Sequence, residues 1–164
     1  MKVFDAAAAK QKAYRLLSLR PHSEKELKKK LREKGFPASV VSETIDALRG
    51  FNYLDDESFA RRWATNLAVN KQWGNKKITF SLREKGIEER LIDAALQVAR
   101  QDVTEEAAVE ALIRKKTSGK RTDSMDNKEK QRIFKSLLGR GFPAGLILRK
   151  LGEAEQGEFD GDER

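Results

Sequence analysis

The string Leu-Arg-Glu-Lys-Gly occurs twice in this chain, at residues 31–35 and 82–86, and this internal repeat constrains the fold more than any other feature. The string Gly-Phe-Pro-Ala likewise occurs at 35–38 and at 141–144. Shared strings at intervals of this length are typical of a chain built from copies of one supersecondary unit. The sequence therefore predicts three repeats, which cover residues 1–50, 51–100 and 101–151.

The residues around each shared glycine have the spacing expected for helices. Apolar residues lie eight and four positions before the three glycines: Leu27 and Leu31, Ile78 and Leu82, Ile133 and Leu137. An i, i+4 apolar pair marks one face of a helix, and glycine is favoured where a helix ends in the left-handed conformation. A second apolar series follows each glycine and another amphipathic segment precedes each pair, so each repeat should hold three helices.

Local signals support the helix starts and argue against strands. Residues Ser23 to Glu26 have the pattern of a capping box, which places the start of a helix there. Acidic residues such as Asp55, Asp56 and Glu105 stand at the expected starts of later helices, where the helix dipole favours negative charge. No stretch alternates at a period of two, so no strand is expected. The predicted fold class is all-α, a tandem array of three three-helix repeats.

Charge is distributed unevenly along the chain. The formal net charge is +8, but residues 152–164 hold six acids and one arginine, so residues 1–151 carry +13. A body that basic is attracted to polyanions such as nucleic acid, or to an acidic protein face. The acidic end has only one large apolar residue, Phe159, so we expect a disordered acidic C-terminal tail over 152–164. The polar stretch 116–128 is expected to be a mobile loop inside the third repeat.

Positive charge recurs on the second helix of each repeat and is the candidate functional feature. The candidate partner-binding residues are Lys28, Lys29 and Arg32, Lys76, Lys77 and Arg83, and Lys130, Arg132 and Lys135. The alternative for any one of them is a solvated helix face, and recurrence in three repeats favours a shared role for the set. We expect the aromatic residues Trp63, Trp73 and Phe80 to pack in a core or between repeats rather than to stack on nucleic-acid bases.

The residue types that catalysis and metal binding need are scarce. The chain has no cysteine and a single histidine, His22, which excludes disulfides, thiolate zinc sites and histidine dyads. Residues 139–144 have the letters of a dinucleotide fingerprint, but they should follow a helix rather than a strand. We therefore predict that the protein is not an enzyme and holds no metal or cofactor. No apolar run is long enough for a membrane span, and we expect a cytoplasmic protein.

A longer pattern across the first two repeats is more specific than any single helix. It comprises Lys34-Gly35-Phe36, Val41, Ile45, Leu48, Tyr53-Leu54-Asp55-Asp56-Glu57-Ser58-Phe59-Ala60, Trp63, Gly74-Asn75-Lys76-Lys77-Ile78 and Leu82-Arg83-Glu84-Lys85-Gly86-Ile87. This pattern resembles the RecX family of bacterial recombinase regulators, and the resemblance extends from residue 13 to residue 151.

The resemblance implies an elongated, curved array of repeats that is a monomer when free. It also implies binding to the RecA recombinase, chiefly as the filament that RecA forms on single-stranded DNA. Binding would inhibit or modulate recombinase, ATPase and co-protease activities in DNA repair, homologous recombination and the SOS response. The alternative function is direct, non-enzymatic DNA binding. Three-helix units resemble helix-turn-helix domains in outline, and +13 on the body suffices for weak, non-specific binding.

Overall fold

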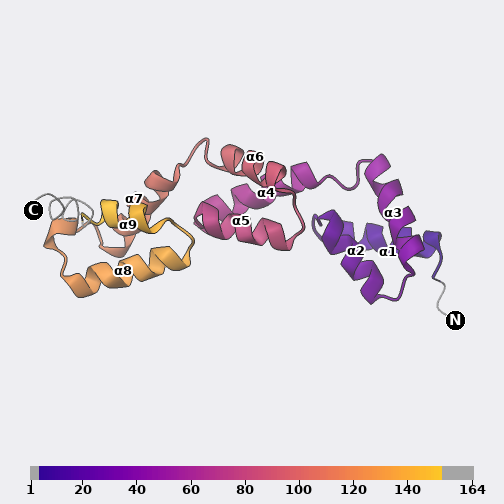
Figure 1. The fold of residues 1–164 in the computed structure, drawn as a ribbon, viewed down its shortest axis with the longest axis horizontal. Helices are drawn as coiled ribbons and strands as arrows, with labels where there is room; N and C mark the ends of the chain where they lie inside the picture. The colour runs from indigo at the N-terminus through magenta and orange to yellow at the C-terminus, as the bar shows by residue number, and fades with distance from the viewer. Residues whose placement is uncertain (1–3, 153–164) are drawn as a thin grey trace, which may run out of the picture. The chain divides into compact units, whose positions relative to one another are not determined.

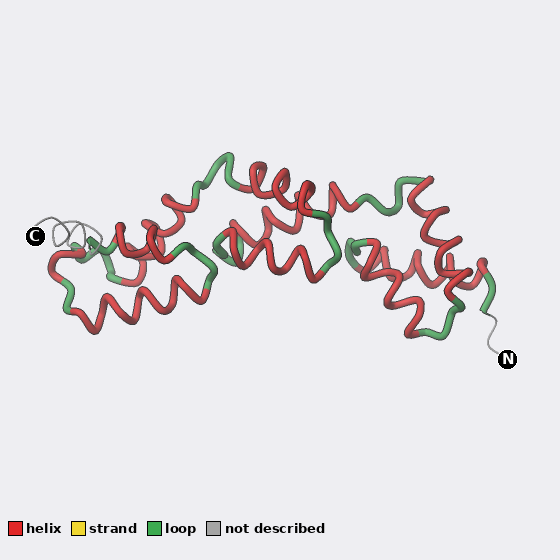
Figure 2. Tube along the Cα trace, in the orientation of Figure 1, coloured by secondary structure: helices red, strands yellow, loops and turns green. Residues whose placement is uncertain are grey.

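The computed structural model describes residues 4–152, and within that range it contains nine α-helices, one 3₁₀-helix and no strand (Figures 1 and 2). The helices are α1 (Ala6–Leu19), α2 (Glu24–Glu33), α3 (Ala38–Gly50), α4 (Asp56–Val69), α5 (Asn75–Glu84), α6 (Glu89–Ala99), α7 (Glu105–Lys116), η1 (Thr122–Ser124), α8 (Asn127–Gly139) and α9 (Ala144–Lys150). The predicted all-α fold is confirmed over this range. The predicted disordered tail lies outside it, apart from Gly152.

The described residues divide into two compact units. One consists of 4–63 and 81–95, and the other consists of 64–80 and 96–152. The division passes through α4, α5 and α6, which are the three helices of the predicted second repeat. The repeat boundaries at 50, 100 and 151 stay a prediction. No helix between residues 4 and 152 combines the length and apolar character that crossing a membrane requires.

The first three helices pack around one apolar core (Figure 1). Leu27 and Leu31 on α2 are fully buried against Ile45 and Leu48 of α3 and Ala13 of α1. The capping box predicted at the start of α2 is present, since the Ser23 side chain accepts from the N–H of residue 26 and the Glu26 side chain accepts from the N–H of residue 23. A fixed helix start together with the i, i+4 pair determines which face of α2 is buried.

Helices α7, α8 and α9 enclose a second core that contains Ile133, Leu137 and Phe142. The segment between α7 and α8 contains η1 and also contributes to this core, because Met125 is buried in it. The next residue, Asp126, is the N-cap of α8 and accepts the N–H of Glu129 at 2.8 Å. Met125 and Asp126 thus make defined contacts where the segment meets α8. The mobility predicted for residues 116–128 stays a prediction.

The three glycines at the ends of α2, α5 and α8 have the same backbone geometry. Their φ angles are +96° at Gly35, +76° at Gly86 and +89° at Gly141, which confirms the predicted left-handed helix ends. In each case the N–H of the residue after the glycine donates to the carbonyl five residues before it, as Phe142 does to Leu137 at 3.3 Å. This is the hydrogen bond of a Schellman motif. The repeat in the sequence thus encodes a repeated helix stop.

One prediction about the aromatic residues, that Phe80 packs in a core or between repeats, is wrong. Trp63 is packed as expected, since its ring stacks on Phe59 at 5.5 Å and its indole N–H donates to the Ser81 hydroxyl at 3.0 Å. Phe80, which was expected to pack, is 62% exposed. Ile78 and Leu82 form the buried face of α5. Phe80 lies between them in the sequence, so its side chain points to another side of the helix.

Candidate functional site

The nine candidate cations lie on three helices, as the repeat predicts. Helix α2 carries Lys28, Lys29 and Arg32, α5 carries Lys76, Lys77 and Arg83, and α8 carries Lys130, Arg132 and Lys135. The apolar i, i+4 pair of each helix faces inward, so the cations lie on the remaining surface. The structure separates them into a group with partners among residues 4–152 and a group without an ion pair in that range.

Four of the nine cations have partners within the chain. Lys28 pairs with Glu24 at 3.0 Å, and Lys29 pairs with Glu33 at 3.9 Å. The Arg83 guanidinium also donates to both oxygens of a carboxylate, that of Glu89. These pairs are solvated, and solvated ion pairs contribute little to the free energy of folding. They therefore do little to hold the fold, and such cations can exchange one anionic partner for another.

Lys77 is the fourth of these cations, and its role is structural. Its side chain is half-buried, the ammonium lies 4.3 Å from the centre of the Trp73 ring, and it donates to the carbonyl of Gly139 at 3.2 Å. A lysine ammonium above an indole face and on a helix-terminal carbonyl is stabilised where it lies. Lys77 is thus the candidate least available to a partner.

The other five cations make no ion pair with a carboxylate of residues 4–152. Arg32, Lys76, Arg132 and Lys135 are exposed, and Lys130 is half-buried. An exposed cation with no partner keeps its full attraction for an external anion. This group, one from α2, one from α5 and three from α8, forms the candidate binding set.

The start of α2 is a junction that the sequence reasoning missed. The Ser23 hydroxyl donates to the carbonyl of Lys85 at 2.7 Å, and the N–H of Glu24 donates to the Asp56 carboxylate at 2.9 Å. The Arg49 guanidinium donates to the Glu24 carboxylate at 2.6 Å. Burial raises the pKa of Asp56, although the Glu24 amide donates to it. The junction ties the end of α5 and the starts of α2 and α4 together.

A second junction at the start of α5 has the same plan. The N–H of Gly74 donates to the carbonyl of Arg140 at 2.7 Å, and the N–H of Asn75 donates to Glu105 at 2.7 Å. Arg100 donates to the Asn75 side chain at 2.8 Å and to the carbonyl of residue 73 at 2.7 Å. Both junctions have two acceptors: the carbonyl of the residue before a helix-ending glycine, and the carboxylate of the acid that begins a later helix. In both, the donors are groups at the start of another helix, α2 in the first junction and α5 in the second. Such recurring contacts are typical of repeat proteins, in which each unit contacts the next along the chain.

Glu26 at the first junction is ionised at neutral pH. Burial would raise the pKa of Glu26, but hydrogen bonds from Arg20, Lys85 and the Ser23 amide outweigh it and bring that pKa to about 2. The Lys85 ammonium also lies 4.9 Å from the centre of the Trp63 ring. Lys85, which directly follows α5, is therefore engaged at the junction, unlike the exposed Lys76 and Arg83 of that helix.

The sequence did contain a signal for these junctions. Arg49 and Arg100 each stand fourteen positions after a shared glycine, and Asp56 and Glu105 are each the first residue of a helix. The arginines thus recur at the same spacing, and the acids follow the same glycines, Gly35 and Gly86, by 21 and 19 positions. The sequence reasoning assigned the acids to the helix dipole alone, whereas the structure shows that they also accept hydrogen bonds from another helix.

Comparison with known proteins gives a consistent result. The family models described as "RecX, first three-helix domain" and "RecX, second three-helix domain" match residues 9–48 and 55–96. The chain is 35% identical over 135 residues to the "Regulatory protein RecX" of Chlorobium limicola, which covers 82% of each chain. It is 31% identical to that of Mycolicibacterium smegmatis, over 82% of this chain and 72% of the relative.

The fold has a counterpart among solved structures. The crystal structure of RecX from Lactobacillus salivarius superposes with a TM-score of 0.76. The match covers 93% of this chain and 97% of that one, at 23% sequence identity. At this identity the likeness concerns the fold alone, and it extends over α7, α8 and α9 as well as the two ranges that the family models match.

Proposed function

Because the chain belongs to the RecX family of regulatory proteins, we propose that it binds RecA, chiefly as the filament on single-stranded DNA, and inhibits its activities. The observation that carries this proposal is the set of exposed cations on equivalent helices, Arg32 on α2, Lys76 on α5 and Lys135 on α8. A RecA–DNA filament offers acidic protein surface and phosphate at regular intervals, and both attract such cations.

The proposed regulator works by occupancy rather than by chemistry. Nothing in the proposal requires a catalytic residue, a metal or a cofactor, because a bound chain interferes sterically with the filament it covers. Lying along the groove and blocking the growing end are two ways to do so, and both use the same cations. Since RecA acts on DNA inside the bacterial cell, the proposal also places the protein in the cytoplasm.

The test is the DNA-dependent ATPase of RecA from the same organism, titrated with the chain. We expect the rate to fall as the chain approaches a stoichiometric amount. A variant with Arg32, Lys76 and Lys135 all changed to Gln should need at least about tenfold more protein for the same inhibition, a difference of about 1.4 kcal/mol. An unchanged rate with the native chain would refute the proposal.

A variant with the same net charge distinguishes the effect of the proposed binding surface on inhibition from the effect of net charge. Arg15, Arg62 and Lys115 are exposed and lie on the first helices α1, α4 and α7, and changing all three to Gln removes the same charge. This control should inhibit RecA nearly as well as the native chain. If it loses as much inhibition as the variant of the second helices, net charge accounts for binding and the surface assignment is wrong.

Direct DNA binding is the second candidate function, and the three unpaired cations of α8 favour it. Its signature is tight, sequence-dependent binding in the absence of RecA. Non-specific binding to phosphate weakens steeply with salt, with a slope set by the number of phosphates contacted. A titration of DNA at two salt concentrations therefore distinguishes a dedicated DNA-binding module from a filament regulator that touches DNA weakly.

A further inference from the structure

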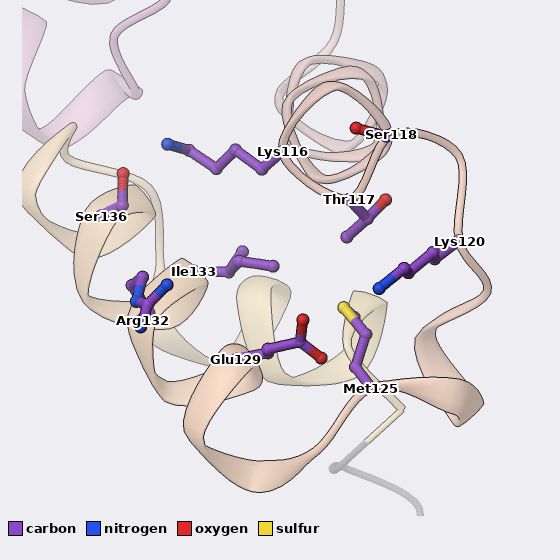
Figure 3. A pocket seen from close by; sticks show the side chains of 9 residues that line it. All are labelled: Lys116, Thr117, Ser118, Lys120, Met125, Glu129, Arg132, Ile133 and Ser136. Carbon is purple, nitrogen blue, oxygen red and sulfur yellow. The ribbon is translucent and has the colours of Figure 1, made fainter.

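A pocket of about 370 Å³ lies between the end of α7, the following turn and one face of α8 (Figure 3). Its floor is apolar, formed by Met125 and Ile133, which are largely buried in the core of α7, α8 and α9. Its walls are polar, formed by Lys116, Thr117, Ser118, Lys120, Glu129, Arg132 and Ser136. A pocket of this size with an apolar floor and a few convergent polar groups is typical of a small-ligand site.

The positive charge at this pocket is not neutralised within the described chain. Lys116, Lys120 and Arg132 make no ion pair with any carboxylate between residues 4 and 152, and the one pocket carboxylate, Glu129, makes none either. In Figure 3 the Lys120 ammonium points into the pocket, toward Met125 and Glu129. Three cations against one acid favour a ligand with an anionic group.

Backbone hydrogen bonds shape the turn that forms one wall of the pocket, and a helix cap positions Glu129 on the other. The turn after α7 is fixed by hydrogen bonds from the N–H of Gly119 to the carbonyl of Arg114 at 3.0 Å and from the N–H of Lys120 to the carbonyl of Thr117 at 3.1 Å. On the other wall, Oε2 of Glu129 accepts the N–H of Asp126 in the capping box of α8. The second oxygen of this carboxylate is left as a positioned acceptor.

We propose that this pocket binds one nucleotide whose base carries an exocyclic amino group. The phosphate lies on Lys120 and Arg132, and the base face lies on the apolar floor. The amino group donates to Glu129, as cytosine N4 does to carboxylates in base recognition. An acidic peptide fits less well because its carboxylates offer neither a flat ring for the apolar floor nor an amino group for Glu129. The nucleotide is either free or a unit of a single strand. The pocket shares Arg132 with the candidate binding set, so the proposal deepens the second candidate function, direct DNA binding, and its test needs no RecA.

The test is fluorescence anisotropy of a labelled single strand of about 12 nucleotides, made of deoxycytidine or of deoxythymidine, with the full chain. We expect the deoxycytidine strand to bind about fivefold more tightly, because thymine lacks the amino group. The variants Lys120→Gln and Arg132→Gln should each weaken binding and lower the salt slope by about 0.7. Lys128 is exposed on the same helix and outside the pocket, so Lys128→Gln is the matched control.

Glu129→Gln tests the base contact without removing the helix cap, since glutamine also forms the capping box. Its carbonyl oxygen takes the Asp126 N–H, which directs the amide NH₂ group into the pocket. The preference for deoxycytidine should then disappear or reverse toward deoxythymidine. Equal binding of the two strands by the native chain would overturn the proposal, as would equal weakening by Lys128→Gln and Lys120→Gln.

Competition identifies the source of the nucleotide. Displacement of the strand by deoxycytidine monophosphate indicates a site for free nucleotides, and strand binding that the monophosphate does not displace indicates a site for a unit of a strand. Both results support the proposal. Displacement by polyglutamate as effective as that by the unlabelled strand would show an acidic peptide site and overturn it.

Discussion

Replacing Gly141 with Ala should destabilise the protein more than the same change at Gly35, another helix-ending glycine. Gly141 has a φ of +89°, a conformation that costs an L residue about 1–2 kcal/mol. An added Cβ would also lie 2.4 Å from Cβ and 2.6 Å from the backbone nitrogen of Lys77. Because a backbone atom cannot rotate away, the second junction must shift, which adds about 1–3 kcal/mol. We expect a total loss of about 2–5 kcal/mol.

Two other Gly→Ala variants separate the contribution of the second junction from that of the helix-end conformation. At Gly35 the φ is +96°, and the nearest atom to an added Cβ is a ring carbon of Phe4 at 3.0 Å, which can move, so Gly35→Ala should lose only about 1–2 kcal/mol. Gly139 is helical with open space around it, so Gly139→Ala should gain about 0.5–1 kcal/mol.

Urea unfolding measures all three changes. With a slope of about 1–3 kcal/mol per molar urea, a loss of about 2–5 kcal/mol lowers the midpoint by roughly 1 M or more. Equal losses for Gly141→Ala and Gly35→Ala would refute the argument, because the helix-end conformation alone would then explain both.

Three further predictions concern α2. Gly35→Val should lower the melting temperature, because a β-branched residue is strained at positive φ; a melting temperature equal to that of the native chain would contradict the left-handed helix end. Ser23→Ala should cost about 1–2 kcal/mol in urea unfolding, since it removes both the N-cap and the hydrogen bond to the Lys85 carbonyl, and a loss near zero would show that the junction is dispensable. The pKa of Glu26 falls from 4.5 to about 2 on folding, so its contribution to stability is complete above about pH 4.5 and is lost as the pH falls toward 2. In Glu26→Gln this part of the pH dependence should be absent, and an unchanged pH profile would contradict the assignment.

Local features of the fold were predictable from the sequence. The helix-ending glycines and the capping box at Ser23 depend on residues within a few positions of one another, so a pattern search finds them. The all-α fold followed from the same patterns. The elongated and curved arrangement of the repeats stays a prediction.

The junctions were harder to predict because their partners are far apart in the sequence. Lys85 is 62 positions from the Ser23 hydroxyl that donates to its carbonyl. Nothing near either residue indicates the other. Lys77 illustrates the consequence for the candidate site, since its sequence context is that of a solvated cation and its tertiary contacts with Trp73 and Gly139 make it structural.

The motif that carried the family resemblance has a structural explanation. Leu54 is buried, Asp55 accepts the N–H of Ser58 at 3.1 Å at the start of α4, and Asp56 accepts the N–H of Glu24 at 2.9 Å. These contacts form a helix start and a junction. The motif therefore identifies the fold, and the binding residues that we propose lie elsewhere, on α2, α5 and α8.

The central claim is that the cations of the three second helices bind a RecA filament. The most direct measurement is an electron-microscopy reconstruction of a RecA–single-stranded DNA filament mixed with the chain. We predict added density into which the three-helix repeats fit, with Arg32, Lys76 and Lys135 facing the filament. A filament without added density, or density in which these residues face solvent, would contradict the claim.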